Sequence, residues 1–142
     1  MAGYHREKID GFKFVKSVPE HLLPQNRPVR DEYRDWPNDK IKADSVAKSL
    51  PFAVCGEHFS GDGNFGTIVR SANGFGAREV FYLSGSSKID RRSMVGAYHY
   101  IDVNHLNTYA DFLALKDKYT FVGLDCYPGA VSYVDFDWWA LP

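Results

Sequence analysis

The sequence predicts an α/β protein built around a parallel sheet. After Pro51, short apolar runs alternate with segments whose apolar residues recur at helical spacing. The runs are continuous rather than alternating, which is typical of strands that are covered on both faces, as in parallel sheets. With 142 residues and 44% hydrophobic content, the chain is long enough to bury the core of one such domain.

Residues 1–50 differ from the rest and are interpreted as an N-terminal extension that wraps or precedes the domain. Four prolines between positions 19 and 37 interrupt any long element, and charged residues crowd the same region. Only residues 39–50 are expected to form a short helix, with Ile41, Val46 and Leu50 as its apolar residues. Residues 51–142 then carry the α/β domain.

The first unit of the domain is expected to be a strand, a helix and a second strand. Residues 52–59 form an apolar run that ends in turn residues, and residues 79–85 form another. Between them, residues 64–75 have a helical spacing of apolar side chains, and Gly76 follows as a typical C-terminal stop. The apolar positions of this helix are Phe65, Ile68, Val69, Ala72 and Phe75.

The second unit continues the pattern with a strand at 98–106, a helix at 108–119 and a strand at 120–127. Cys55 and Cys126 fall in expected strands, and we expect two buried thiols there. The chain closes on residues 128–142, which contain two adjacent tryptophans with no later element to pack on. We therefore expect the sequence to be cut short.

The composition narrows the function classes. The net charge of −1 neither indicates nor excludes a nucleic-acid partner, and the His and Cys residues show no metal-ligand spacing. No run approaches the ~18 apolar residues of a membrane span, and the charged N-terminus lacks a signal-peptide core. We expect an intracellular, cytoplasmic protein without a bound metal or a membrane.

A glycine-rich turn at residues 61–66 matches the dinucleotide fingerprint G-x-G-x-x-G. The fingerprint also requires an acidic residue about 20 positions later to hold a ribose, and residues 83–86 contain none. Asp62, inside the turn, would repel a pyrophosphate. A nucleotide-binding βαβ domain is therefore an alternative, and a less favoured one.

Arg70 is the stronger candidate for ligand contact. Gly66 lies one turn before it, and Asn73 and Gly74 follow three and four residues after it, so small or polar residues line its helix face. The planar guanidinium suits phosphate or ribose oxygens. Asn64 has the residue type that is preferred at a helix N-cap.

Residues 64–83, "NFGTIVRSANGFGAREVFYL", resemble the first signature motif of the SpoU (TrmH-like) branch of the SPOUT RNA methyltransferases. The matching positions are Asn64, Gly66, Arg70, Ala72, Phe75 and Gly76. Residues 93–103, "SMVGAYHYIDV", resemble the small-residue segment that leads into the family's third strand. The resemblance covers about residues 52–141.

This resemblance implies an enzyme that transfers a methyl group from S-adenosylmethionine to a ribose 2′-hydroxyl of tRNA or rRNA. It also implies a homodimer and a sheet whose C-terminal part forms a trefoil knot around the cofactor. Arg70 and Asn64 would be the catalytic residues: Arg70 would contact the RNA and orient the 2′-hydroxyl, and Asn64 would fix the loop and Arg70. Separately, Lys88, Arg91 and Arg92 lie in an expected loop where they can contact RNA phosphates.

The second and third motifs of the family are expected beyond Pro142, together with the cofactor-binding residues. The resemblance therefore implies a partial methyltransferase domain, which is inactive as given. A non-catalytic RNA-binding module derived from the same family is the alternative that this departure leaves open.

Overall fold

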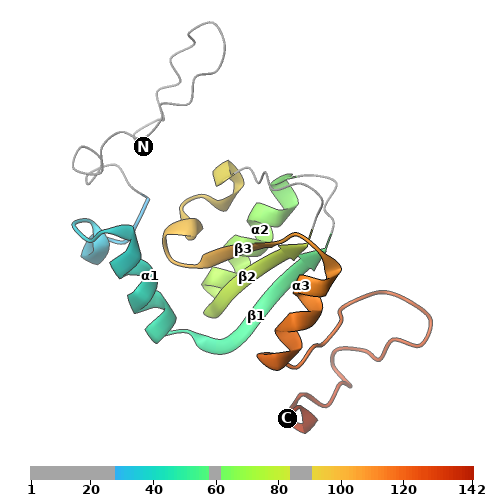
Figure 1. Cartoon of the computed structure of the whole chain (residues 1–142). Coiled ribbons are helices and arrows are strands. Elements are labelled where there is room, and N and C mark those ends of the chain that lie inside the picture. Colours follow the sequence, from blue (N-terminus) through green and yellow to red (C-terminus); the bar gives the residue numbers. More distant parts are fainter. Residues whose placement is uncertain (1–27, 58–61, 84–90) are drawn as a thin grey trace, which may run out of the picture.

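A computed structural model of the chain describes residues 28–57, 62–83 and 91–142 (Figure 1). Three parallel strands form the sheet, and they lie side by side in the same order as in the chain. This arrangement confirms the predicted α/β class. Among the described residues, no helix combines the length and the apolar character needed to cross a lipid bilayer. The strands are β1 (Leu50–Glu57), β2 (Ala77–Leu83) and β3 (Asp102–Leu106).

Helix α2 (Asp62–Gly74) connects β1 to β2 and covers one face of the sheet. Phe65, Val69 and Ala72 turn toward the strands and are buried, as their helical spacing predicts. Ile68 is half-buried, and Phe75, expected as the last apolar residue of the helix, lies beyond its end and is 76% exposed. Gly76 ends the helix in the left-handed conformation, with φ +77°, and its N–H donates to the carbonyl of Asn73. The expected C-terminal stop is therefore confirmed.

The two faces of the sheet have different covers, because successive strand residues point to opposite sides. Val80 and Tyr82 belong to the core beneath α2, and Tyr82 packs on Phe65 with ring centroids 5.1 Å apart. Phe81 points to the opposite face, where its ring packs against the ring of Tyr119. Figure 1 shows α2 behind the sheet and α3 (Tyr109–Ala114) in front of it.

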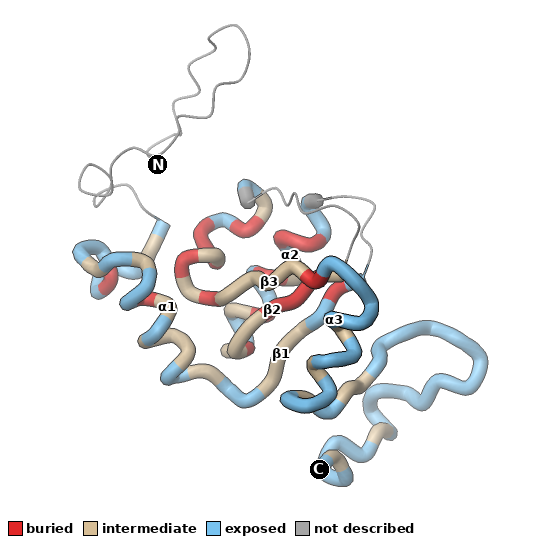
Figure 2. Tube along the Cα trace, in the orientation of Figure 1, coloured by how far each residue is buried: buried red, intermediate tan, exposed pale blue. Residues whose placement is uncertain are grey.

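Buried residues are concentrated in β2, in α2 and in the segment that precedes β3 (Figure 2). That segment contains two short 3-10 turns, η3 (Arg91–Met94) and η4 (Ala97–His99). Met94 and Ile101 are almost fully buried there. The segment is therefore part of the core and not a surface loop.

The expectation of a fourth strand at 120–127 is wrong. Within the part of the chain that the structure describes, these residues pair with no strand, and from Gly123 onward they are exposed. Phe121 stacks instead on Phe112 of α3, with centroids 4.7 Å apart, so a ring contact holds the start of the segment in place of a hydrogen-bonded ladder. Cys126 is exposed in this segment and Cys55 is exposed on β1, so the expectation of two buried thiols is also wrong.

The expected elements around β3 are shorter in the structure. The strand begins at Asp102 rather than at 98, because the left-handed Gly96 (φ +86°) turns the chain into η4 first. The following helix begins after Thr108, whose side chain caps it in a capping box with Asp111. It continues only to Ala114, and η5 (Leu115–Asp117) follows.

Residues 28–48 pack against the segment before β3. Helix α1 (Asn38–Ala47) places Ile41 at 0% exposure, and Lys42 Nζ lies 2.6 Å from the Asp102 carboxylate. The expectation that Leu50 belongs to this helix is wrong: Leu50 is the first residue of β1 and is 55% exposed. The contacts show that this part of the N-terminal region is integrated with the sheet domain.

Candidate functional site

Asn64 lies in the first turn of α2 and not at its N-cap. The helix already begins at Asp62, and the Thr67 hydroxyl donates a 3.2 Å hydrogen bond to the carbonyl of Gly63 within this turn. The expectation that Asn64 caps the helix is therefore wrong. Its side chain is exposed and, within the described residues, makes no hydrogen bond to Arg70.

Arg70 lies midway along α2 on the solvent side. It is exposed, and the described part of the chain offers its guanidinium no hydrogen-bond or ion-pair partner. The next residues on the same face are Asn73, which is half-buried, and Gly74, which is exposed. The five N–H donors of Arg70 are thus available to a ligand.

Gly66 does not leave open space beside Arg70, as the sequence suggested. Gly66 is buried, and a β-carbon added to it would lie 1.8 Å from Ser93 Oγ and 2.4 Å from Ser93 Cβ. The glycine is required because the η3 backbone approaches the helix here.

Turn η3 packs against α2 and carries two further cationic residues, Arg91 and Arg92. Arg92 is exposed and directly precedes Ser93. Arg91 begins η3, its side chain lies outside the described part, and Lys88 falls wholly outside the described residues. The structure therefore places Arg92 one residue before the Ser93 contact with Gly66, and the role of Arg92 in RNA contact stays a prediction.

The position of these residues in the topology suits a ligand site. Helix α2 follows the carboxyl end of β1, and η3 follows the carboxyl end of β2. In open parallel sheets, ligands bind outside the carboxyl ends of the strands. Asn64 and Arg92 both belong to segments that begin at this edge.

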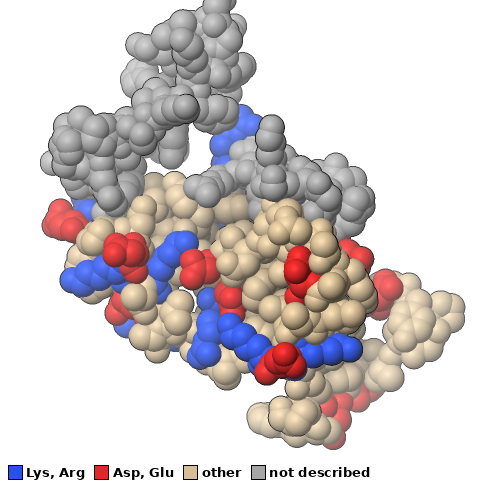
Figure 3. Space-filling model, viewed as in Figure 1, with Lys and Arg blue, Asp and Glu red and all other residues tan. Residues whose placement is uncertain are grey.

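Charge is mixed over the face of the molecule seen in Figure 3. Lys and Arg side chains lie beside Asp and Glu side chains there. In the chain, Lys48 Nζ lies 2.6 Å from Asp44 Oδ2. Their hydrogen bond and their attraction hold the pKa of Asp44 below its ordinary value and raise the pKa of Lys48. Such paired charges are neutralised within the chain, so they are weaker candidates for phosphate contact than the unpaired Arg70.

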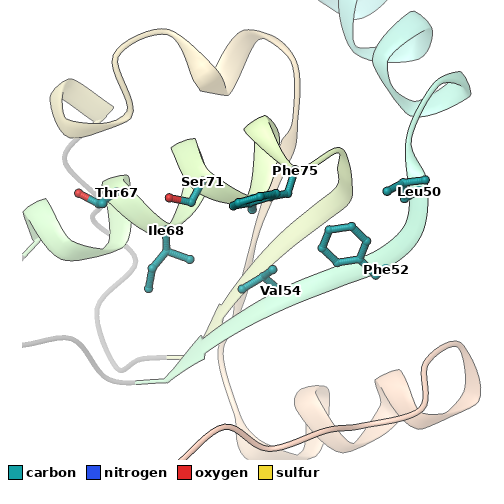
Figure 4. Close-up of a pocket in the computed structure, with 8 residues that line it drawn as sticks. Leu50, Phe52, Val54, Thr67, Ile68, Ser71 and Phe75 are labelled. Atoms are coloured by element: carbon teal, nitrogen blue, oxygen red, sulfur yellow. The ribbon is translucent and has the colours of Figure 1, made fainter. Parts of the chain in front are cut away.

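A hollow of about 550 Å³ lies between β1 and α2 (Figure 4), and Arg70 is not among the residues that line it. Aliphatic and aromatic side chains dominate its lining, and its only side-chain polar groups are the hydroxyls of Thr67 and Ser71. S-adenosylmethionine carries a sulfonium, an ammonium and a carboxylate group, and charged groups of this kind need polar partners. The hollow therefore does not fit that cofactor. Its lining residues are Leu50, Phe52, Val54, Thr67, Ile68, Ser71, Ala72 and Phe75.

The described residues contain no group of three or more His, Cys, Asp or Glu side chains placed to hold a metal ion.

Sequence reasoning missed Ser93 as a neighbour of α2. A helix glycine such as Gly66 signals close packing, but it does not identify the distant segment that packs on it.

The comparison with protein families gives one match. The sequence model described as the SpoU rRNA Methylase family matches residues 51–140, nearly the same range as the resemblance noted from the sequence. No curated protein matches this chain. No solved structure matches it either.

Proposed function

Because this chain belongs to the SpoU rRNA methylase family, a family of RNA methyltransferases in the SPOUT superfamily, we propose that it acts on a ribose 2′-hydroxyl of tRNA or rRNA. The observation that carries the proposal is Arg70, an exposed arginine at the motif position of α2 that has no partner among the residues described by the structure. A guanidinium kept free of carboxylates is suited to an anionic ligand such as the RNA backbone.

In this proposal Arg70 binds and orients the acceptor ribose. A guanidinium has donors only and no acceptor site, so Arg70 does not take up the proton of the 2′-hydroxyl. It instead donates hydrogen bonds to the ribose or to an adjacent phosphate, and it stabilises the negative charge that develops on the 2′-oxygen as the hydroxyl proton passes to an RNA phosphate oxygen or to solvent water. Holding the hydroxyl in one orientation also lowers the entropy barrier of the reaction.

In this proposal, Asn64 and the cationic residues after β2 also bind the RNA that accepts the methyl group. The exposed Asn64 amide lies at the start of α2, where it can hydrogen-bond RNA. Arg92, together with Arg91 and Lys88, would contact phosphates, which fix the register of the RNA without reading its sequence.

The methyl donor is proposed to be S-adenosylmethionine, which the family generally uses and whose sulfonium supplies an activated methyl group. No cofactor residue is assigned, because the hollow between β1 and α2 does not fit it. The family resemblance also leads us to propose a homodimer and a cytoplasmic location.

The poor fit of the hollow favours a second candidate function, a non-catalytic RNA-binding module. One set of measurements separates the two. A fluorescein-labelled tRNA transcript is titrated with the 142-residue chain, and transfer of a tritiated methyl group from S-adenosylmethionine to the same transcript is then followed. Binding with transfer supports the enzyme, and binding without transfer supports the module. Absence of binding to tRNA and to rRNA fragments contradicts both.

A further inference from the structure

The contact between Gly66 and Ser93 joins two segments of the candidate site. Ser93 lies so close to the helix that even its backbone carbonyl carbon would be 2.7 Å from a β-carbon at position 66. By contrast, Gly63 and Gly74 of the same helix have no atom within 4 Å of such a β-carbon. Of these three helix glycines, Gly66 alone is fitted to a neighbour.

The segment that carries Ser93 is fixed at further points. Met94 is 2% exposed and belongs to the core, and a β-carbon on Gly96 would lie 2.7 Å from Pro28. Between them Val95 has φ +46°, a left-handed conformation that is strained for a β-branched residue. Strain persists only where the surroundings enforce it, so residues 93–96 are held in a defined position against α2.

This arrangement determines where Arg92 lies relative to Arg70. Arg70 follows Gly66 by four residues, about one helical turn on the same face, and Arg92 precedes Ser93 by one residue. Both arginines are exposed. Arg92 is therefore adjacent in the chain to the residue that contacts α2 one helical turn before Arg70.

We propose that Gly66 and Ser93 are positioning residues that set the spacing between Arg70 and Arg92, so that both guanidiniums engage the backbone of one RNA strand. The inference rests on the function proposed above and adds to it a defined pair of cationic contacts. Neither Gly66 nor Ser93 touches the RNA in this proposal. They act by keeping Arg92 within reach.

The first test compares Gly66→Ala with Gly63→Ala, two identical changes in one helix. The methyl group at position 66 displaces η3, whereas the methyl group at position 63 enters open space. Anisotropy titration of the labelled tRNA transcript should show roughly tenfold weaker binding for Gly66→Ala and unchanged binding for Gly63→Ala. The slope of log K against log salt should also fall by about one for Gly66→Ala, because one phosphate contact is lost.

The second test separates positioning from general destabilisation. Arg92→Ala should weaken binding in the unmodified chain but have no further effect in the Gly66→Ala background, since Arg92 is already out of reach there. A chain that is merely less stable would show the full effect of Arg92→Ala in both backgrounds. Equal effects in the two backgrounds would overturn the proposal.

Ser93→Gly keeps the proposal testable if Gly66→Ala does not fold, because it removes the contact without a clash. It should weaken RNA binding and lower the salt slope; wild-type values of both would overturn the proposal. Failure of the unmodified chain to bind any RNA is a different result. It contradicts the proposed function, and the positioning role falls with it.

Discussion

The backbone N–H of Arg30 donates a 2.6 Å hydrogen bond to the hydroxyl of Tyr100, although 70 residues separate them in the chain. Close by, Asn38 Oδ1 lies 2.8 Å from His99 Nδ1, and Lys42 pairs with Asp102. Three side chains before and at the start of β3, those of His99, Tyr100 and Asp102, are thus held by the N-terminal region. This bracing connects residues 28–48 to the segment that carries Ser93 and Arg92.

Tyr100→Phe should lower the free energy of unfolding by about 1 kcal/mol, because the Arg30 N–H loses its acceptor while the packing of the ring is kept. Urea denaturation measures the change. Tyr109→Phe is the matched control, since Tyr109 is 59% exposed and should change stability little. Equal stability of both variants would mean that the Arg30–Tyr100 hydrogen bond contributes nothing.

Ile41→Ala should destabilise the whole domain by about 2–5 kcal/mol, since a fully buried side chain is replaced by a cavity. Val46→Ala, at a half-buried position of the same helix, should cost less. A single cooperative transition that moves as a whole in Ile41→Ala would show that α1 folds together with the sheet. An unchanged transition would show that α1 is energetically separate.

Arg70→Ala should reduce methyl transfer by roughly 100-fold in a chain that shows activity, because one preorganised charge contact to the transition state is lost. Its unfolding free energy should change by no more than about 0.5 kcal/mol, as is usual for an exposed residue without partners. Arg70→Lys should restore little, since an ammonium cannot replace the planar fork. Lys116→Ala, at another exposed cation, is the control; wild-type transfer by Arg70→Ala would remove Arg70 from the site.

Stability should decline in alkaline solution because of the cluster around Glu79. The Glu79 carboxylate accepts hydrogen bonds from Lys118 and Tyr119. The hydrogen bond to Glu79 raises the pKa of Lys118 above its ordinary value of 10.5. The pKa of Tyr119 is raised above 10.0 mainly by burial and, to a smaller extent, by its hydrogen bond to Glu79.

Since both folded pKa values are raised, the stabilisation is complete below the unfolded values and is lost as pH rises through the folded ones. Urea denaturation between pH 8 and pH 12 should show this loss. Glu79→Gln should show a smaller loss, and Asp117→Asn, at an exposed carboxylate, should behave as wild type. A pH-independent free energy of unfolding in the unmodified chain would contradict the stabilising role given to Lys118 and Tyr119.

Val95→Asn should stabilise the protein by about 1 kcal/mol, because asparagine tolerates the left-handed conformation that strains valine. Val131→Asn is the control: Val131 is similarly exposed and lacks a positive φ. Thermal unfolding of the two variants gives the comparison. A destabilised Val95→Asn would indicate that the exposed valine side chain makes a contact of its own.

The sequence determined the features that depend on neighbours along the chain. The apolar spacing located α2 and the first two strands to within two residues, because helical and extended periodicities are local properties. Gly76 was recognisable as a helix stop for the same reason. The motif around Asn64 and Arg70 indicated the family, which the match over residues 51–140 confirms; the roles of both residues remain predictions.

Only the tertiary structure decided which distant segments meet. The pattern at 120–127 has the local character of a strand, but a strand also needs a partner edge, and these residues pair with none. The helical spacing showed Gly66 beside Arg70, yet it could not show that Ser93 fills that position. Contacts between residues far apart in the chain depend on how whole elements pack, and this information is absent from any short window of sequence.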